Sequence, residues 1–245
     1  RKARTTDVDE LDEAFDAGAR RYDLLVGLNP GYHRHLRSAA RALIEQVPAG
    51  GLIADLGCGS GLSTRALLAA GGATVLGVDA SAGMLRVARA KAWPPGVSFV
   101  HSPAQDLAQV LRDRGAGPLD GAFAAYLLRN VPEGERLDFL LALRAALRPG
   151  ANVVLQDYSL APGRRPLAIW RLVCRAVITP LATAVDGNAE LYDYLEESVV
   201  TNWAPARIAG ALREAGFTDV VVRTVPGWQR GILHDFRARA GGRPS

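Results

Sequence analysis

The segment ADLGCGSGLSTRALLAAGGATVLGVDAS, residues 54–81, constrains the fold of this chain more than any other. Three glycines, Gly57, Gly59 and Gly61, separate an apolar run from an amphipathic one, and Asp79 ends the apolar run that follows. A glycine loop between a strand and a helix lets a ligand approach the backbone near the positive end of the helix. A carboxylate at the end of the second strand can accept hydrogen bonds from both hydroxyls of a ribose. The loop, the helix and Asp79 together predict a site for an adenosine-containing ligand.

The spacing of the glycines separates this loop from two other nucleotide-binding loops. Its pattern is G-x-G-x-G with Asp55 two residues before the first glycine, whereas a dinucleotide fingerprint reads G-x-G-x-x-G. The segment contains no G-K-[ST], so a phosphate-cradling P-loop is excluded. An NAD-dependent dehydrogenase is therefore disfavoured, and binding of a nicotinamide cofactor would be needed to revive that alternative.

Apolar runs and helical patterns alternate along the middle of the chain. The strand-like runs are 52–56, 73–79, 97–101, 119–125 and 151–158, and the helical patterns are 62–70, 81–92, 104–113 and 133–148. Alternation of this kind predicts a parallel sheet with helices on both faces. No internal repeat interrupts it, so we expect one α/β domain.

The two ends of the chain depart from this alternation. Two helical stretches near the start are broken by the turn sequence Asn29-Pro30-Gly31. The chain ends with a helical pattern at 204–215 and strands near 219–225 and 230–239, which a short turn at Pro226-Gly227 should pair in antiparallel. We divide the single domain, 1–245, into a helical lid at 1–47, a cofactor-binding core at 51–158, a cap insertion at 159–203, and a C-terminal helix and hairpin at 204–245.

The composition predicts a soluble protein of the cytoplasm. There is no run of about 18 uncharged apolar residues, no signal-peptide core, and the two cysteines, Cys58 and Cys174, match no disulfide or metal framework. The formal net charge of +4 is carried mainly by scattered arginines, a pattern that disfavours a nucleic-acid footprint. The four histidines show no H-x-x-x-H spacing, so we expect no metal site.

The pattern D-x-G-x-G-x-G followed by an acid at the end of strand two resembles that of class I S-adenosylmethionine-dependent methyltransferases. The segments DASAGMLRVARAK and LRPGANVVLQDYS follow the order of that family. A closer resemblance spans almost the whole chain, because FDAGARRYDLL, LLRNV, YDYLEESVV and LREAGFTDV are similar to motifs of the ubiquinone/menaquinone biosynthesis C-methyltransferases (UbiE-like). The resemblance implies a Rossmann-like, seven-stranded, mostly parallel sheet with an antiparallel last strand. It also implies C-methylation of a reduced quinone ring, as in demethylmenaquinol.

The same resemblance implies S-adenosylmethionine as the cofactor and gives roles to individual positions. The expected cofactor-binding residues are Tyr22, Asp55, Gly57, Cys58, Gly59, Gly61, Asp79, Ala80, Met84, Ala104, Gln105, Ala125 and Tyr126. The expected catalytic residues are Arg129, Asp157 and His33, and the expected substrate-binding residues are Asn130, Tyr158, Tyr192 and Tyr194.

Arg129 has the clearest chemical role of these. It follows the fourth strand, at the crevice outside the strand carboxyl ends where open α/β sheets bind ligands. The alternative is that this arginine forms a structural ion pair. A positive charge beside a hydroquinone hydroxyl favours the phenolate, which pushes electron density onto the ring carbon. The ring proton could then pass through water to Asp157 or His33, although Asp157 could equally cap the turn after its strand.

Several positions depart from the family pattern. Pro103 stands where an acidic or amide residue usually meets the adenine amine, and Leu127, Leu36 and Gln229 replace a glycine, a tryptophan and part of a glycine-rich stretch. Because most of these changes lie on the acceptor side, two alternatives stay open. One is an O-, N- or C-methyltransferase of specialised metabolism, and the other is a non-catalytic S-adenosylmethionine-binding module.

The expected partner is a small-molecule acceptor with an apolar tail, and no nucleic acid. A nucleic-acid amino-methyltransferase would carry D/N-P-P-Y after strand four, where this chain has AYLL. The amphipathic element 166–185, with Arg171 and Arg175, could touch an anionic membrane surface or form a solvated helix face. The oligomeric state stays open.

Overall fold

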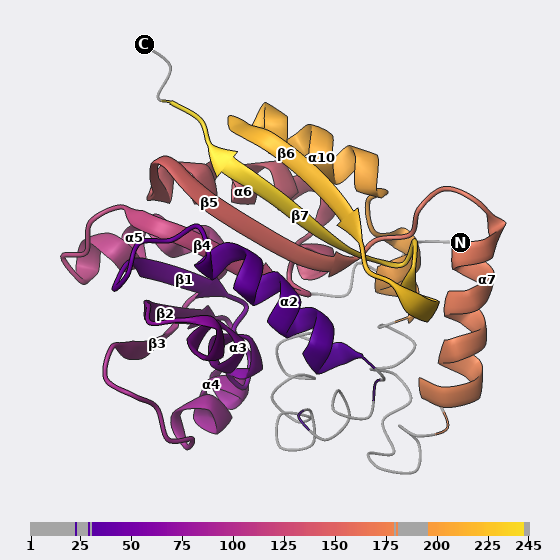
Figure 1. Ribbon diagram of the computed structural model, residues 1–245, viewed down its shortest axis with the longest axis horizontal. Coiled ribbons are helices and arrows are strands. Elements are labelled where there is room, and N and C mark those ends of the chain that lie inside the picture. The colour runs from indigo at the N-terminus through magenta and orange to yellow at the C-terminus, as the bar shows by residue number, and fades with distance from the viewer. Residues whose placement is uncertain (1–22, 24–28, 30, 179, 181–195, 243–245) are drawn as a thin grey trace.

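The computed structural model describes residues 23, 29, 31–178, 180 and 196–242 of the chain. Its centre is one sheet of seven strands in the order β3-β2-β1-β4-β5-β7-β6. The strands are β1 (Leu52–Leu56), β2 (Thr74–Asp79), β3 (Val97–His101), β4 (Leu119–Ala125), β5 (Leu147–Tyr158), β6 (Phe217–Thr224) and β7 (Leu233–Ala240). The pairings among β1 to β5 are parallel, and β7 runs antiparallel to both β5 and β6 (Figure 1). The expected mostly parallel sheet with an antiparallel last strand is confirmed.

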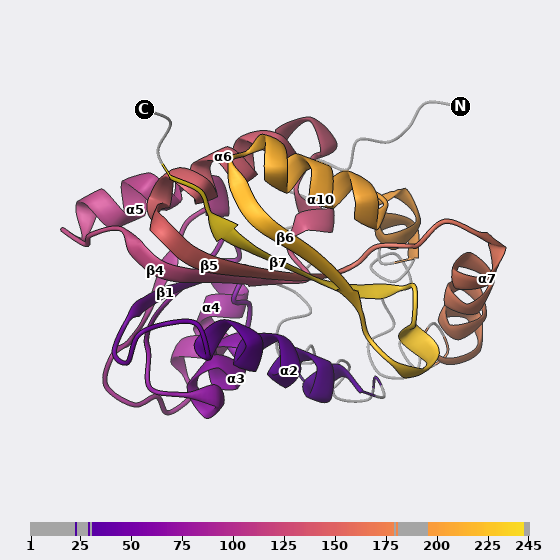
Figure 2. The same ribbon diagram turned by 45° about the horizontal axis from the view of Figure 1, so that its top comes forward.

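Helices cover both faces of this sheet, as the alternating pattern predicts. The α-helices are α2 (Tyr32–Ile44), α3 (Leu62–Ala70), α4 (Ala82–Arg89), α5 (Leu107–Asp113), α6 (Arg136–Ala146), α7 (Arg164–Val173) and α10 (Pro205–Glu214). Figure 2 shows α5, α6 and α10 on one face of the sheet and α2 and α3 on the other, with α7 beyond the ends of the strands. The sheet is therefore the middle layer of a three-layer α/β/α domain.

The two core clusters explain why the central strands read as continuous apolar runs. Along β5, Val153 and Leu155 join the cluster under α6 and α10, whereas Val154 joins the cluster under α2 and α3. A strand buried on both faces needs apolar side chains at every position. Phe123 and Ala124 of β4 divide between the two clusters in the same way.

The boundary between α6 and β5 differs from the expected one. The helical pattern was expected to run to residue 148, but α6 ends at Ala146 and β5 begins at Leu147. Leu147 pairs with Leu119 of β4, and the register then shifts between Leu119 and Gly121. Proline disfavours the helical conformation for the residue before it, so Pro149 favours an extended Arg148.

The chain after β5 shows two further differences. The expected two-residue turn at Pro226-Gly227 is part of a longer connection between β6 and β7 that contains a 3₁₀ turn at Gly227–Gln229. The helix α7 continues as a π-helical segment at Cys174–Ile178, which the 3.6-residue pattern could not predict. Tyr22, Tyr192 and Tyr194 lie outside the described residues.

Candidate functional site

A cavity of about 320 Å³ opens where β1, β2 and β4 end. In an open α/β sheet, ligands bind outside the strand carboxyl ends at the point where the strand order reverses, and here β1 lies between β2 and β4. Expected site residues on its wall are Gly57, Gly59, Asp79, Ala80, Met84, Ala104, Gln105, Ala125, Tyr126, Arg129 and Asn130. The structure thus gathers residues from four separate stretches of sequence around one space, 57–59, 78–84, 103–105 and 125–135.

The glycine loop needs its glycines for two reasons. Gly57 and Gly59 have φ angles of 64° and 54°, a left-handed conformation that favours glycine. A Cβ on Gly57 would lie 3.0 Å from Cδ1 of Leu127, and one on Gly59 would lie 3.0 Å from Cε of Met84. Both glycines therefore keep the wall of the cavity open. Gly61 has another role, because it precedes α3 and a Cβ there would lie 2.7 Å from the ring of Trp93.

Asp79 joins the glycine loop to the end of β2. Its Oδ2 accepts a hydrogen bond from the backbone N–H of Gly59 at 2.7 Å, and its Oδ1 accepts one from Ser81 N–H at 2.9 Å. A carboxylate has about four lone-pair positions, so these two hydrogen bonds alone do not use all of them. Ser81, rather than Asp79, caps α4, because its Oγ accepts from Met84 N–H at 3.0 Å.

Asp55 and Cys58 lie beneath the loop and not on the cavity wall. Oδ2 of Asp55 accepts from the hydroxyls of Ser63 at 2.8 Å and Thr64 at 2.6 Å, which ties β1 to the first turn of α3. Burial raises the pKa of the Asp55 carboxyl to about 7, against the lowering effect of the two hydroxyls. Burial also raises the pKa of the Cys58 thiol well above its usual value, so this thiol is protonated and unreactive at neutral pH.

Arg129 and Asp157 form a buried ion pair beside the cavity. Nη1 of Arg129 donates to the backbone oxygen of Tyr126 at 2.7 Å and lies 3.4 Å from Oδ1 of Asp157. The backbone N–H of Arg129 donates to Oδ2 of Asp157 at 3.0 Å, and Tyr158 N–H donates to Oδ1 at 2.8 Å. Burial raises the pKa of the Asp157 carboxyl, and the positive charge of Arg129 opposes that rise. Arg129 lines the cavity, whereas Asp157 does not line it and contacts Arg129 within the protein interior.

Four aromatic rings extend from this pair in a continuous column. Tyr32, Tyr126, Tyr158 and Trp170 follow one another with ring centroids 5.2, 5.2 and 5.1 Å apart. The Arg129 guanidinium lies 5.9 Å from the Tyr126 ring and 6.0 Å from the Tyr158 ring, within the range of a cation–π contact. The column therefore joins α2, the ends of β4 and β5, and α7 around one positive charge.

The hydroxyl of Tyr158 is held from two sides. Its oxygen accepts from Asn29 Nδ2 at 3.0 Å and from Gln229 Nε2 at 3.2 Å. Gln229 is a position where the sequence departs from the family pattern. The departure consequently reaches the aromatic column.

Comparison with known proteins agrees with these observations. Residues 53–150 match a family described as a methyltransferase domain. A demethylmenaquinone methyltransferase of Beutenbergia cavernae is 36% identical over 228 residues, which cover 92% of this chain and 88% of the relative. The chain belongs to the ubiquinone/menaquinone C-methyltransferase family. A second member, the C-methyltransferase UbiE of Acidiphilium cryptum, is 30% identical over 93% of this chain and 90% of its own length.

Solved structures of more distant methyltransferases share the fold. Magnesium protoporphyrin IX methyltransferase from Synechocystis superposes with a TM-score of 0.65 at 19% identity, covering 95% of this chain and 99% of that one. The 1,6-didemethyltoxoflavin N1-methyltransferase of Burkholderia thailandensis gives the same TM-score and identity over 99% and 94% of the two chains. The Rossmann-like class I methyltransferase fold is therefore confirmed.

The remaining expected residues lie in different places. His33 is exposed at the start of α2 and does not line the cavity. Its ring is nearly perpendicular to that of Tyr32, with ring centroids 5.3 Å apart. Asn130 lines the cavity and donates from Nδ2 to the backbone oxygen of Tyr126 at 3.2 Å. Asp23, which follows the family tyrosine, accepts from Ser60 Oγ and from Lys91 Nζ, the latter at 2.5 Å. The N-terminal segment is thus anchored beside the glycine loop at this residue.

Some residues of the site carried no readable signal in the sequence. The cavity wall also includes Val78, Ser81, Pro103, Leu127, Val131, Pro132 and Glu135, and the aromatic column adds Tyr32 and Trp170. Of these, the family resemblance already places Pro103 and Leu127 at the site, and Ser81 could have been found as a helix cap two residues after Asp79. The described residues contain no group of three or more His, Cys, Asp or Glu that could hold a metal ion. Within the same residues, no helix has the length and apolar character needed to cross a membrane.

Proposed function

We propose that this chain transfers a methyl group from S-adenosylmethionine to a ring carbon of a reduced quinone of the demethylmenaquinol type. Relatives at 30 to 36% identity, named demethylmenaquinone methyltransferase or UbiE, support this acceptor. The observation that carries the proposal is the placement of Arg129, a buried cation on the cavity wall between two tyrosine rings.

The residues of the cavity fit the cofactor. Gly57 and Gly59 present backbone where a side chain would fill the space, and Asp79 presents a carboxylate for the ribose hydroxyls. Ala104 and Gln105 line the cavity after β3, where their backbone groups can meet the adenine edge. S-adenosylmethionine supplies, when bound, a methyl group already activated on a sulfonium. The protein then has to align donor and acceptor for in-line displacement and to activate the acceptor.

Arg129 supplies the activation. A hydroquinone hydroxyl resembles that of tyrosine, whose pKa is about 10, and a nearby cation favours its ionised form. An arginine stays charged at all relevant pH values, so it can stabilise the phenolate without titrating. The phenolate pushes electron density onto the ring carbon, which forms the new bond to the methyl group and afterwards loses its proton.

Asp157 positions Arg129, and we do not assign it as the group that takes the ring proton directly. Its two oxygens already accept from Arg129 N–H, Arg129 Nη1 and Tyr158 N–H, and it does not line the cavity. His33 is exposed and is also absent from the cavity wall. We propose instead that water carries the proton away from the ring carbon.

An apolar tail on the acceptor would leave the site along the segment after β5. Helix α7 presents Leu172, 66% exposed, and its continuation presents Val177, 47% exposed, together with Arg171 and Arg175. A helix with exposed apolar and basic residues can lie at a membrane surface. We propose that this element is the exit for the tail, and that 1–47 and 159–203 act as lid and cap.

The test is incubation of the protein with reduced demethylmenaquinone and labelled S-adenosylmethionine, with mass spectrometry of the product. The expected product carries one additional methyl group on a ring carbon. Methylation of a polar phenol, with none of the quinol, would instead favour a methyltransferase of specialised metabolism. That second candidate is supported by the contact of Gln229 with Tyr158, since this departure from the family reaches the acceptor side.

A further inference from the structure

A groove between α2 and α3 is lined by three arginines and lies apart from the cofactor cavity. Its lining residues are Arg34, Arg37, Ser38 and Arg41 of α2, with Ala66, Ala69 and Ala70 of α3. We call it the arginine groove, and its volume is about 360 Å³. About a dozen molecules of liquid water occupy such a volume, so the groove has room for a phosphate with its attached glycerol.

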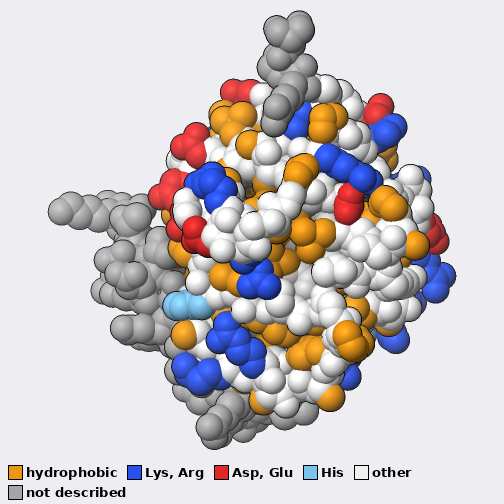
Figure 3. Space-filling model, turned by 90° about the vertical axis from the view of Figure 1, so that its left-hand side faces the viewer, with side chains coloured by type: hydrophobic (Ala, Val, Ile, Leu, Met, Phe, Trp, Pro, Cys, Tyr) orange, Lys and Arg blue, Asp and Glu red, His pale blue; other side chains and the backbone are white. Residues whose placement is uncertain are grey.

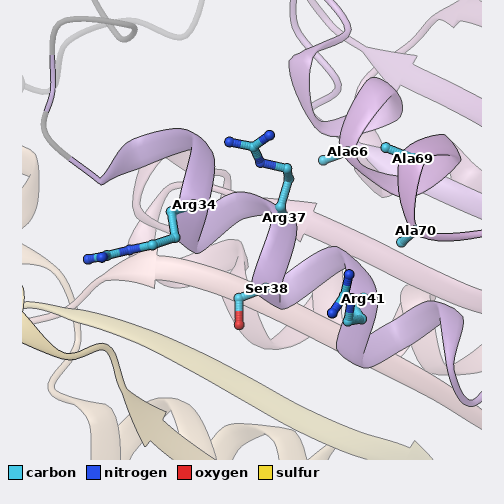
Figure 4. Close-up of a pocket in the computed structure, with 7 residues that line it drawn as sticks. All are labelled: Arg34, Arg37, Ser38, Arg41, Ala66, Ala69 and Ala70. Atoms are coloured by element: carbon cyan, nitrogen blue, oxygen red, sulfur yellow. The ribbon is translucent and has the colours of Figure 1, made fainter.

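The helical period gathers these arginines on one side of α2. Arg34, Arg37 and Arg41 are three and four residues apart, a spacing that places side chains on one helix face. Figure 4 shows Arg37 and Arg41 beside the alanines of α3, with Arg34 extending away from α3. A rise of 1.5 Å per residue makes the row about 10 Å long.

The charge of the groove is not compensated along its walls. Together α2 and α3 carry four arginines, the fourth being Arg65, and neither helix contains Asp or Glu; the nearest acid in sequence is Glu45, the C-cap of α2. Among the described residues, no ion pair includes Arg34, Arg37 or Arg41. On the face drawn in Figure 3, basic side chains in the upper part lie close to acidic ones, whereas those in the lower part lie among apolar and uncharged side chains. The groove is therefore a local concentration of positive charge.

We propose that the arginine groove binds the phosphates of anionic phospholipid headgroups and holds α2 against a membrane surface. Guanidinium groups bind phosphate oxygens in a forked geometry, and the alanine methyls offer an apolar floor for the glycerol carbons. Nε of Arg37 is held by the backbone oxygen of His33 at 3.1 Å, which leaves its two terminal nitrogens for the ligand. A row about 10 Å long exceeds one phosphate and suits a surface that presents several.

The groove is connected to the active site through α2 itself. Tyr32, at the start of the helix, stacks on Tyr126, and Tyr126 lines the cofactor cavity. A membrane held by the exposed face of α2 would thus lie one helix width from the aromatic column. The inference does not depend on which acceptor is methylated, because it follows from the charge and shape of the groove alone.

Vesicle flotation at low salt tests the inference with a charge-matched control. The double variant Arg37→Gln/Arg41→Gln removes the two groove arginines beside α3, and Arg213→Gln/Arg223→Gln removes two exposed arginines from α10 and β6. Each arginine near an anionic surface strengthens binding about fivefold, so the groove variant should bind phosphatidylglycerol vesicles roughly thirtyfold more weakly. The control variant should bind these vesicles as tightly as the unmodified protein does. Neutral phosphatidylcholine vesicles should bind none of the three proteins.

Three outcomes would overturn the inference. If both variants lost vesicle binding equally, the effect would come from net charge and not from the groove. If the groove variant lost no vesicle binding, the membrane contact would lie elsewhere, for example at α7. Binding of soluble glycerol phosphate in the groove, without binding of vesicles, would assign it to a free phosphate. Calorimetry with S-adenosylmethionine should show unchanged affinity in both variants, which establishes that they are folded. Quinol methylation is not measured, so failure of the proposed function would leave this result intact.

Discussion

Asp157 holds Arg129 at two points, through the backbone N–H at 3.0 Å and through the guanidinium at 3.4 Å. The first contact fixes the backbone of the short 3₁₀ turn Leu128–Asn130, which follows β4. The second contact fixes the direction of the Arg129 side chain. Removing one partner of a buried ion pair leaves an uncompensated charge, so the two residues depend on each other. The cation at the cavity wall is therefore set by a carboxylate on the neighbouring strand β5.

Replacement of Arg129 by alanine should lower turnover at least tenfold and leave the affinity for S-adenosylmethionine nearly unaltered. In the proposed mechanism the side chain stabilises charge on the acceptor, so its loss should affect the reaction more than cofactor binding. The variant should recover partly as the pH rises toward 10, because the hydroquinone then ionises unaided. Steady-state kinetics against pH and calorimetry provide the two measurements.

The matched control for that variant is Arg148→Ala. Arg148 forms an ion pair with Asp120 at 2.6 Å, far along β5 from the cavity, and is partly exposed. Turnover within twofold of the unmodified enzyme is expected there. If Arg129→Ala also kept full turnover on the quinol, activation by a cation would have to be abandoned.

Replacement of Asp79 by alanine should weaken binding of S-adenosylmethionine at least tenfold. Hydrogen bonds to a charged group contribute about 1.5 to 3 kcal/mol each, and the change also frees the N–H of Gly59 that Asp79 now holds. Calorimetry measures the affinity directly. Asp113→Ala, a change at an exposed carboxylate on α5, serves as the control and should bind normally. Equal affinities in the two variants would contradict a ribose contact at Asp79.

Sequence patterns brought the glycine loop and Asp79 to the cavity wall but did not reveal the aromatic column, for a physical reason. The glycine loop and Asp79 belong to one short stretch of chain, so their spacing in the sequence is enough to predict that they lie close together. The aromatic column instead joins Tyr32 to Trp170 through strand ends far apart in sequence, and only the order of the strands brings them together. Asp157 illustrates the same limit, because the sequence placed it near the site but could not show that it faces Arg129.

Leu127 and Gly57 should be energetically coupled. A Cβ on Gly57 would lie 3.0 Å from Leu127, which stands where the family usually has glycine, and φ at Gly57 is 64°. Gly57→Ala should therefore destabilise the protein by about 1 to 3 kcal/mol, from backbone strain together with the close contact. In a Leu127→Gly background the contact is absent, so the same change should cost less.

A double-mutant cycle on urea unfolding measures that coupling. Ala108→Gly, a change in α5 away from the loop, provides a control background in which Gly57→Ala should keep its full cost. Identical costs of Gly57→Ala in the Leu127→Gly and Ala108→Gly backgrounds would show that backbone strain alone explains the glycine.

The buried carboxyl of Asp55 should make the folded protein less stable as the pH rises from 5 to 8. Its pKa is raised to about 7 in the folded state, while an unfolded aspartate has a pKa of about 3.9. Between those values the folded state holds a proton that the unfolded state has lost, so a rise in pH favours unfolding. The free energy of unfolding should fall by about 2 to 3 kcal/mol over this range because of this group.

Asp55→Asn keeps an oxygen for Ser63 and Thr64 but cannot ionise, so the free energy of unfolding of this variant should fall by about 2 to 3 kcal/mol less between pH 5 and pH 8. Urea unfolding at pH 5 and pH 8 compares the two proteins, with the exposed Asp138→Asn as the control for titration elsewhere. The same pH dependence in all three would mean that Asp55 ionises normally despite its burial.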